Sequence, residues 1–296
     1  MDLFTILPLS TPDHYQACED LQVAVWQADP VEVIPAHVLI TAQRHGGLVL
    51  GAFDPTGQLI GFLFGFPGTT ASDNPLVADA HLEHCSHSMG VHPQWQGRGV
   101  GYRLKCAQRE WVLRQGLELV TWTFDPLEAG NGTLNLGKLG ALCRCYLRDL
   151  YGEMTEGINA GLPTDRFEVA WWVASEQVRK RLEQGWLPPR LEALLSEGAV
   201  ILNAGRPRAD GWVEPSDPIP PAGEQVLVEV PARIQAIKAA APELALAWRL
   251  SVRAACEAAF AAGYTACDVV HAEMAGLRRV YYVLRSGIAD PRQASG

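Results

Sequence analysis

The sequence has few of the features that mark membrane, secreted or nucleic-acid-binding proteins. No apolar run approaches the roughly 18 residues of a membrane span, and the Met1-Asp2 start lacks the basic flank of a signal peptide. The seven cysteines form no Cys-x-x-Cys pair, so a disulfide framework is not expected. The 24 lysines and arginines are outnumbered by 33 aspartates and glutamates, which argues against a broad basic surface for nucleic acid. We therefore expect a cytoplasmic protein with reduced thiols and with neither nucleic acid nor membrane as partner.

What the chain does have is enough apolar sequence for a sizeable core, since 48% of its 296 residues are hydrophobic. Hydrophobic periodicity and turn residues predict an α/β order of elements. Strands are expected at 3–9, 48–53, 59–66, 81–91, 117–124, 141–147, 167–174, 226–230, 266–270 and 280–284. Helices are expected at 10–26, 35–45, 101–116, 131–139, 176–184 and 234–262, the last interrupted at Pro242.

A glycine-rich turn follows the strand expected at 81–91, and it reads Gln96-Gly97-Arg98-Gly99-Val100-Gly101. Three glycines let successive backbone N–H groups point into one concavity, and the helix that begins there adds its positive dipole end. Such a turn suits a pyrophosphate, although on spacing alone a tight strand-to-helix corner explains it equally well. It is neither the G-x-G-x-x-G fingerprint after a first strand nor a P-loop ending in Gly-Lys-Ser/Thr.

The positions Gln96-x-x-Gly99-x-Gly101, preceded by Val91-x-Pro93, resemble the acyl-CoA-binding motif of the GNAT N-acetyltransferase superfamily, Q/R-x-x-G-x-G/A. The order of expected elements agrees with that family from Leu3 to about Ala174. Other segments resemble a less characterised branch of predicted GNAT proteins with a C-terminal extension, in which some relatives are thought to acylate amino acids from succinyl-CoA. These segments are 86–91, 124–127, 131–140 and 163–167.

The resemblance implies acetyl-CoA or another acyl-CoA as co-substrate. In that family the strand before the turn splays away from its neighbour and pairs its free backbone groups with pantetheine, which here falls to Val91. The turn amides hold the pyrophosphate, and Arg103 or Lys105 adds positive charge there or remains an ordinary helix cation. The other cofactor-binding residues implied are Met89, Gln96, Gly97, Arg98, Gly99, Val100, Gly101 and Asn131.

Acyl transfer to an amine needs a base for the amine and benefits from an acid for the leaving thiolate. His87 is the candidate base, because an imidazole accepts a proton at neutral pH and some family members carry a histidine four residues before the position of Val91. The two-residue period of a strand places Glu83 on the same face, where it can orient His87 or relay the proton. The same period puts His84 on the opposite face from His81 and His87, which argues against a zinc site, and we expect no metal.

Many family members place a tyrosine on the helix after the fifth strand, four residues before its terminal glycine, to protonate the thiolate. In this sequence that count from Gly140 reaches Leu136, so Tyr146 or Tyr151 is the candidate substitute, or the thiolate leaves with only backbone or water stabilisation. Three residues are candidates for the acceptor pocket. These are Trp26 at the end of the first helix, Asp125 just past a strand and Arg166, whose guanidinium suits a carboxylate. Each has a structural alternative of at least equal weight.

The predicted fold class is α/β, a GNAT-type mixed and mostly antiparallel sheet flanked by helices, with a smaller α/β C-terminal region. We expect a catalytic domain at 1–175 and a C-terminal extension at 176–296, in which the Pro-rich stretch 206–223 is an exposed linker or long loop. The tail repeats the order strand, proline, helix, glycine, strand. Two interpretations stay open for it, a degenerate GNAT-like half or a chance recurrence of a common unit.

Together these observations favour a CoA-dependent N-acyltransferase acting on the amine of a small molecule such as an amino acid, by direct attack in a ternary complex. The C-terminal part then completes the pocket or forms a homodimer interface. One alternative is a non-catalytic acyl-CoA-binding sensor or scaffold, which the missing helix tyrosine favours. Another is a nucleotide-binding enzyme unrelated to CoA.

Overall fold

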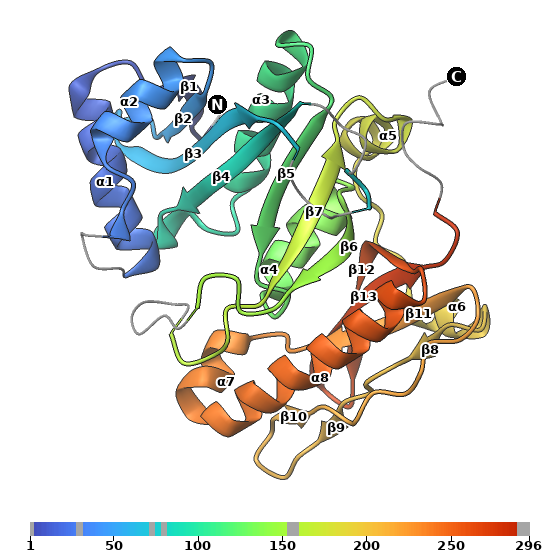
Figure 1. Ribbon diagram of the computed structural model, residues 1–296. Helices are drawn as coiled ribbons and strands as arrows, with labels where there is room; N and C mark the ends of the chain where they lie inside the picture. The colour runs from blue at the N-terminus through green and yellow to red at the C-terminus, as the bar shows by residue number, and fades with distance from the viewer. Residues whose placement is uncertain (1–2, 28–31, 71–74, 78–81, 153–159, 289–296) are drawn as a thin grey trace. The chain divides into compact units, whose positions relative to one another are not determined.

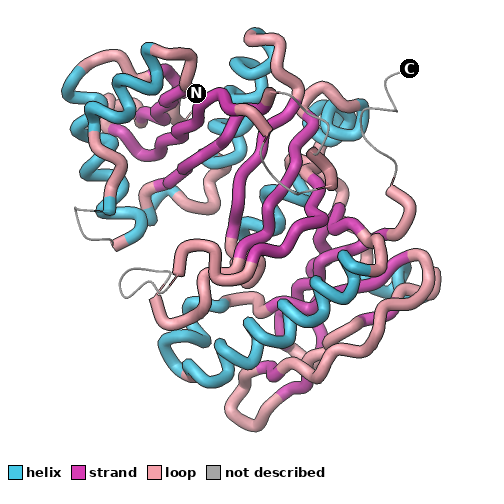
Figure 2. Tube along the Cα trace, viewed as in Figure 1, coloured by secondary structure: helices cyan, strands magenta, loops and turns pink. Residues whose placement is uncertain are grey.

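The computed structural model describes residues 3–27, 32–70, 75–77, 82–152 and 160–288, which form two compact units (Figures 1 and 2). Unit 1 takes the described residues of 1–72 and 79–122, and unit 2 those of 73–78, 123–154 and 161–296. The segment 123–154 thus packs with the C-terminal half of the chain. The division after Ser175 stays a prediction about domains.

Unit 1 is a sheet in the order β1-β2-β3-β4-β5, with antiparallel neighbours from β1 to β4 and a parallel β4–β5 pair. Its strands are β1 (Thr5–Pro8), β2 (Leu48–Phe53), β3 (Leu59–Gly68), β4 (Glu83–Val91) and β5 (Leu119–Phe124), the last two residues of β5 belonging to unit 2. Its helices are α1 (Pro12–Trp26), α2 (Ala36–Arg44), the short η2 (Pro93–Trp95) and α3 (Val100–Arg114).

Alternation in β2 and β3, with one register shift where Ala52 pairs with Gly61 and Phe53 with Leu59, builds a core on each face of this sheet. Val49 and Phe62 pack in a cluster with α1 and α2, whereas Leu50 and Leu63 pack in a cluster with Val100 of α3. Because successive side chains of a strand point to opposite faces, two apolar runs serve both cores at once. The helices therefore cover opposite faces, α1 and α2 one side and α3 the other (Figure 1).

A β-bulge interrupts this regularity in β4. Phe64 pairs with Ser88 and Phe66 with Cys85, so Ser86 and His87 together face the single residue Gly65. A Cβ on Gly65 would lie 2.4 Å from His84 Nε2. The bulge adds one residue to β4 and so reverses the facing of every side chain beyond it.

Unit 2 has the strand order β7-β6-β12-β13-β11-β8, plus a separate β9–β10 ribbon. Its first elements are α4 (Ala129–Gly132), the π-helix η3 (Thr133–Lys138), β6 (Leu142–Leu147), β7 (Arg166–Trp172), α5 (Glu176–Gln184) and α6 (Leu191–Ser196). They are followed by β8 (Val200–Ile201), β9 (Arg206–Pro207), β10 (Val213–Glu214), β11 (Gln225–Val230), α7 (Ile234–Ala240), α8 (Pro242–Ala261), β12 (Thr265–Met274) and β13 (Leu277–Arg285).

The predicted fold class, a mixed and mostly antiparallel sheet flanked by helices, is confirmed. The tail does not reproduce the central unit of the first half. There β4 and β5 are adjacent and parallel, whereas β13 lies between β11 and β12 and is antiparallel to both. The sequence also missed α6 and β8, two short elements within 191–201.

The Pro-rich stretch 206–223 lies within unit 2 and contains the β9–β10 ribbon. Trp248 Nε1 donates to the carbonyl of Val213 at 2.9 Å, and Ser251 Oγ donates to that of Ser216 at 3.1 Å. Two side chains of α8 thus hold the loop against the unit. None of the described helices has both the length and the apolar character that a membrane crossing requires.

Candidate functional site

The turn between β4 and α3 presents a run of unpaired amides. Among the described residues, no oxygen accepts a hydrogen bond from the backbone N–H groups of Gly97 through Tyr102. Gly97 and Gly99 adopt φ values of +74° and +83°, and nothing lies within 4 Å of where a Cβ would be at either. An open, glycine-lined loop with free amides ahead of a 15-residue helix fits a pyrophosphate.

Two side chains of the motif fix the loop. Gln96 Nε2 donates to the carbonyl of Val91 at 3.2 Å, which ties the turn to the end of β4. The Gln96 amide itself donates to Pro93 O at 3.4 Å, so it is not among the free donors. The exposed guanidinium of Arg98 lies over the Trp95 ring at 5.1 Å, so it is held at the mouth of the loop.

The strands beneath the loop pair over a short length. The β4–β5 register comprises His84↔Val120 and Cys85↔Thr121, both before the bulge. From Ser88 to Val91 the register of β4 is with β3 on its other side. This leaves the second half of β4 with a backbone edge that can pair with an extended ligand.

The bulge separates the predicted β4 residues between the two faces. His87 is exposed beside Phe64 and Phe66, with ring centroids 5.6 and 6.0 Å away. Met89 and Val91, which a strict two-residue period would place beside His87, pack instead in the cluster on the α3 side. His87 therefore faces the α1–α2 side of unit 1, away from the side chains of Met89 and Val91, two of the predicted cofactor-binding residues.

His87 has the properties of a base at neutral pH. Partial burial lowers its pKa below the usual 6.5, so its ring is neutral and can accept a proton. Trp26, half-buried in an edge-to-face contact with Phe62 at 5.6 Å, belongs to the same side of the sheet. Glu83 begins β4 four residues earlier. The roles of these three residues stay predictions.

On the other face of β4, the structure holds a buried lysine that the sequence reasoning placed at the phosphates. Lys105 Nζ donates to Ser86 Oγ at 2.8 Å and to Gln108 Oε1 at 3.2 Å, and it lies 3.6 Å from the centroid of the Trp122 ring. Lys105 is 2% exposed, so it is not a phosphate ligand. Leu104, Gln108 and Val112 are buried on the same face of α3 as Lys105. Their helical spacing was the sequence signal that could have predicted the burial of the lysine.

We expect Lys105→Met to stabilise unit 1 by about 1 kcal/mol or more, because burial costs an ammonium more than a thioether. Burial lowers the pKa of Lys105 well below 10.5. Between the folded pKa and 10.5 the unfolded chain holds a proton that the folded chain lacks, so stability rises with pH, by at most about 1.4 kcal/mol per pH unit. Urea unfolding at several pH values measures both effects.

The matched control is Lys180→Met, whose lysine is exposed on α5 and should change stability by less than about 0.5 kcal/mol. Loss of the pH slope in the Lys105 variant alone supports a neutral buried amine. A destabilised variant that keeps the slope contradicts it.

In unit 2 the predicted substrate residues Asp125 and Arg166 lie close together. Arg166 Nη1 is 3.8 Å from Asp125 Oδ2, and its guanidinium lies over the Tyr151 ring at 5.1 Å. Asp125 also accepts from Arg249 Nη2 at 2.6 Å, a residue 124 positions later in the chain. Both predicted substrate contacts thus take part in a buried ionic cluster, and their substrate role stays a prediction.

Arg249 was not found from the sequence, because its position in an alanine-rich helix gave no signal. It is 1% exposed, and its Nε and Nη1 have no hydrogen-bond partner among the described residues. Asp125 is therefore the counter-ion of a fully desolvated guanidinium.

Tyr146 lies in a second ionic group of unit 2. Its hydroxyl donates to Asp165 Oδ2 at 2.6 Å, and Arg253 donates to both oxygens of Asp165 at 2.7 Å. Burial raises the pKa of Tyr146 well above 10, and the carboxylate of Asp165 reinforces this. The role of Tyr146 as the acid stays a prediction, and this geometry weighs against it.

The segment predicted as the helix at 131–139 is a short α4 followed by the π-helix η3. Leu136, at the position of the family's tyrosine, is fully buried, and Asn131 is exposed on α4. The turn is tightly enclosed, since a Cβ on Gly132 would lie 2.6 Å from the Tyr282 hydroxyl and one on Gly137 2.9 Å from the Trp186 ring. The cofactor role of Asn131 stays a prediction.

Metal binding finds no support in the part of the chain that the structure describes, where no group of three or more His, Cys, Asp or Glu side chains is arranged to hold an ion. His81, one member of the sequence cluster, lies outside the described residues.

A comparison with models of protein families and one with curated proteins found no match. Solved structures similar to this chain include the ribosomal-protein-S18-alanine N-acetyltransferase from Escherichia coli. The two sequences are 17% identical, the match covers 57% of this chain and 94% of that chain, and the TM-score is 0.43. A GNAT family acetyltransferase from Elizabethkingia anophelis with acetyl-CoA bound has 15% identity, with 58% and 99% covered and a TM-score of 0.41.

The topology of the chain itself agrees with the fold that the sequence resemblance implies. Unit 1 has four antiparallel strands, a parallel fifth strand and a glycine-rich turn before α3. The mixed and mostly antiparallel sheet that the sequence resemblance implies is thus confirmed.

Proposed function

We propose that the chain is an acyl-CoA-dependent N-acyltransferase that acts on the amine of a small molecule. The observation that carries the proposal is the run of free amides from Gly97 to Tyr102 at the N-terminus of α3, directly beyond the unpaired edge of β4. These groups suit the two ends of one cofactor arm, because amides at a helix N-terminus bind phosphate and a free strand edge binds an amide chain such as pantetheine.

In this proposal each residue has a defined task. The amides of Gly97, Arg98 and Gly99 hold the diphosphate, and the exposed guanidinium of Arg98 adds positive charge. Gln96 fixes the turn to β4 through Val91. His87 removes a proton from the ammonium or attacking amine, directly or through water, so that the nitrogen lone pair forms the new C–N bond as the C–S bond of the thioester breaks.

The first test is thiol release with acetyl-CoA and succinyl-CoA across amino acids and polyamines. His87→Ala is expected to lower turnover by about 100-fold, the usual contribution of a positioned base. His45→Ala is the matched control, because His45 is exposed at the end of α2 and has no assigned role. Equal turnover in both variants would remove His87 from the mechanism.

The pH profile gives an independent check on His87. Its lowered pKa keeps the imidazole neutral down to below pH 6.5, so kcat/KM should fall only on the acidic side of that value. Below the folded pKa the ring is protonated and cannot act as a base. An acidic limb well above pH 6.5 would point to another group.

A second candidate function is a non-catalytic acyl-CoA sensor. It is favoured by the buried Leu136 in place of a hydroxyl and by the commitment of Tyr146 to Asp165. Calorimetry with CoA and the thiol-release assay together separate the two proposals, because both predict CoA binding and only the transferase releases thiol with an acceptor.

A further inference from the structure

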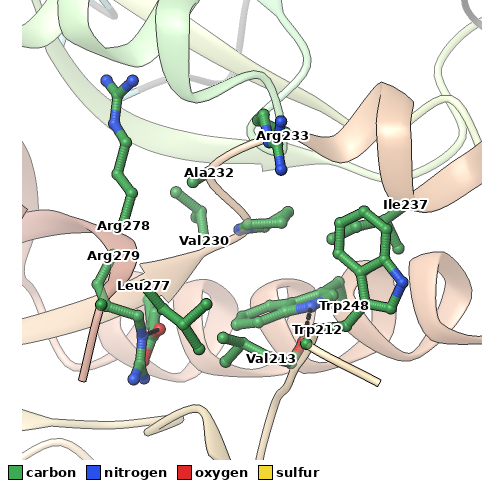
Figure 3. A pocket seen from close by; sticks show the side chains of 14 residues that line it. Trp212, Val213, Val230, Ala232, Arg233, Ile237, Trp248, Leu277, Arg278 and Arg279 are labelled. Carbon is green, nitrogen blue, oxygen red and sulfur yellow. Dashed lines mark hydrogen bonds and ion pairs between the residues drawn. The ribbon is translucent and has the colours of Figure 1, made fainter. Parts of the chain in front are cut away.

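Unit 2 contains a cavity of about 400 Å³ that the proposed transfer reaction does not use (Figure 3). It is formed by the loop before β10, the end of β11, the start of α7, one residue of α8 and the β12–β13 turn. The volume lies at the lower end of the range for small-ligand sites, which is roughly 300–1,000 Å³. It suits a compact molecule and is too small for a dinucleotide or CoA.

One part of the wall is flat and apolar. Trp248 Nε1 donates to Val213 O at 2.9 Å, which satisfies the indole and fixes its orientation (Figure 3). Trp212 is half-buried beside it, and Ile237 and Leu277 add aliphatic surface. An indole ring whose polar group is already bonded, as in Trp248, favours a planar apolar guest.

The rest of the wall is cationic. Of its three arginines, Arg279 is neutralised by a buried ion pair with Glu229, which also binds the amide of Gly205. Arg233 and Arg278 are exposed, and among the described residues neither has a carboxylate within ion-pair distance. The recorded contact of Arg278 is with His271 Nδ1, at 3.4 Å.

Among the described residues this leaves two guanidinium groups outside any ion pair on one small cavity of a chain whose net charge is −9, with Glu273 directly across the hairpin from Arg278. A guanidinium binds a carboxylate through two parallel N–H···O bonds and stacks readily on aromatic rings. The ligand that matches both halves of the wall carries a negative group on a flat apolar body.

We propose that this cavity is a binding site for a small aromatic carboxylate, held by Trp212 and Trp248 on its ring and by Arg233 and Arg278 on its carboxylate. The site is made wholly of unit 2 residues, and it stands whether or not the transferase proposal is correct.

Calorimetry on the full chain tests it with three probes of one shape: indole-3-acetate, the neutral indole-3-acetamide and the cationic tryptamine. We expect the acid to bind about tenfold more tightly than the amide and tryptamine to bind most weakly. Arg233→Gln combined with Arg278→Gln should bring acid and amide within about twofold of each other. Trp212→Ala should weaken both probes alike.

The matched control is Arg190→Gln, since Arg190 is an 84%-exposed arginine of the same unit outside the cavity. It should leave the preference for the acid unchanged, as should saturation with CoA. Equal affinity for acid and amide, no saturable binding up to about 5 mM, loss of the preference in the control or competition by CoA would each overturn the proposal.

Discussion

Gly99→Val is expected to weaken CoA binding by about 100-fold or more while the chain stays folded. Gly99 has φ +83°, a conformation that a β-branched residue avoids, so the loop backbone must move. Each charge-assisted hydrogen bond from an amide to phosphate contributes about 1.5–3 kcal/mol, and losing two of them accounts for the effect. Calorimetry with CoA measures it.

Gly57→Val provides a control with matched backbone strain. Gly57 lies in the β2–β3 hairpin at φ +87°, and like Gly99 it has nothing within 4 Å of its Cβ position. Both variants should lose similar stability, but only the Gly99 variant should lose CoA. Wild-type affinity in Gly99→Val would refute the assignment of this loop to the diphosphate.

Asp125→Ala is expected to cost unit 2 about 3–5 kcal/mol, because it leaves the buried charge of Arg249 without a counter-ion. Arg166, 3.8 Å from the same oxygen and 8% exposed, loses an ion-pair partner in the same variant. The double variant Asp125→Ala/Arg249→Met should recover most of the loss, since it removes the stranded guanidinium as well. Urea unfolding of the two variants gives the comparison.

Asp210→Ala is the control for this result. It breaks the exposed Arg208–Asp210 ion pair of the same unit, which should cost less than about 1 kcal/mol. If Asp125→Ala proves equally mild and instead lowers turnover, Asp125 contacts the substrate and its ionic role is secondary.

Local signals predicted most of the elements, because local chemistry dictates them. Thr11 caps α1 by accepting from the amide of His14, followed by Pro12 in the first turn, and both residues marked that start in the sequence. The alternation of β2 and β3 and the glycine turn before α3 could be recognised in the sequence in the same way.

The bulge in β4 could not be predicted, since it depends on the pairing of Ser86 and His87 with Gly65. A strict period of two therefore grouped His87 with Met89 and Val91, which the structure places on the opposite face. Similarly, the two interpretations of Lys105, a phosphate contact or an ordinary helix cation, both left out its burial, because nothing local shows that Ser86 and Gln108 take up its hydrogen bonds.

Contacts between residues far apart in the sequence were the second feature that could not be predicted. The hydroxyl of Tyr282 donates to Pro126 O at 2.7 Å, and Arg249 reaches Asp125. No periodicity or motif couples positions so distant, so the packing of 123–154 with the C-terminal half could not be predicted.

The ion pair between Asp125 and Arg249 has a consequence for how the sequence of this chain can diverge in evolution. Arg249 loses its ion-pair partner when Asp125 is replaced, so we expect a change at position 125 to accompany or follow the replacement of Arg249 by an uncharged residue. The end of the first half and the long helix near the C-terminus must consequently be inherited as one piece, and the tail cannot be exchanged like a detachable module.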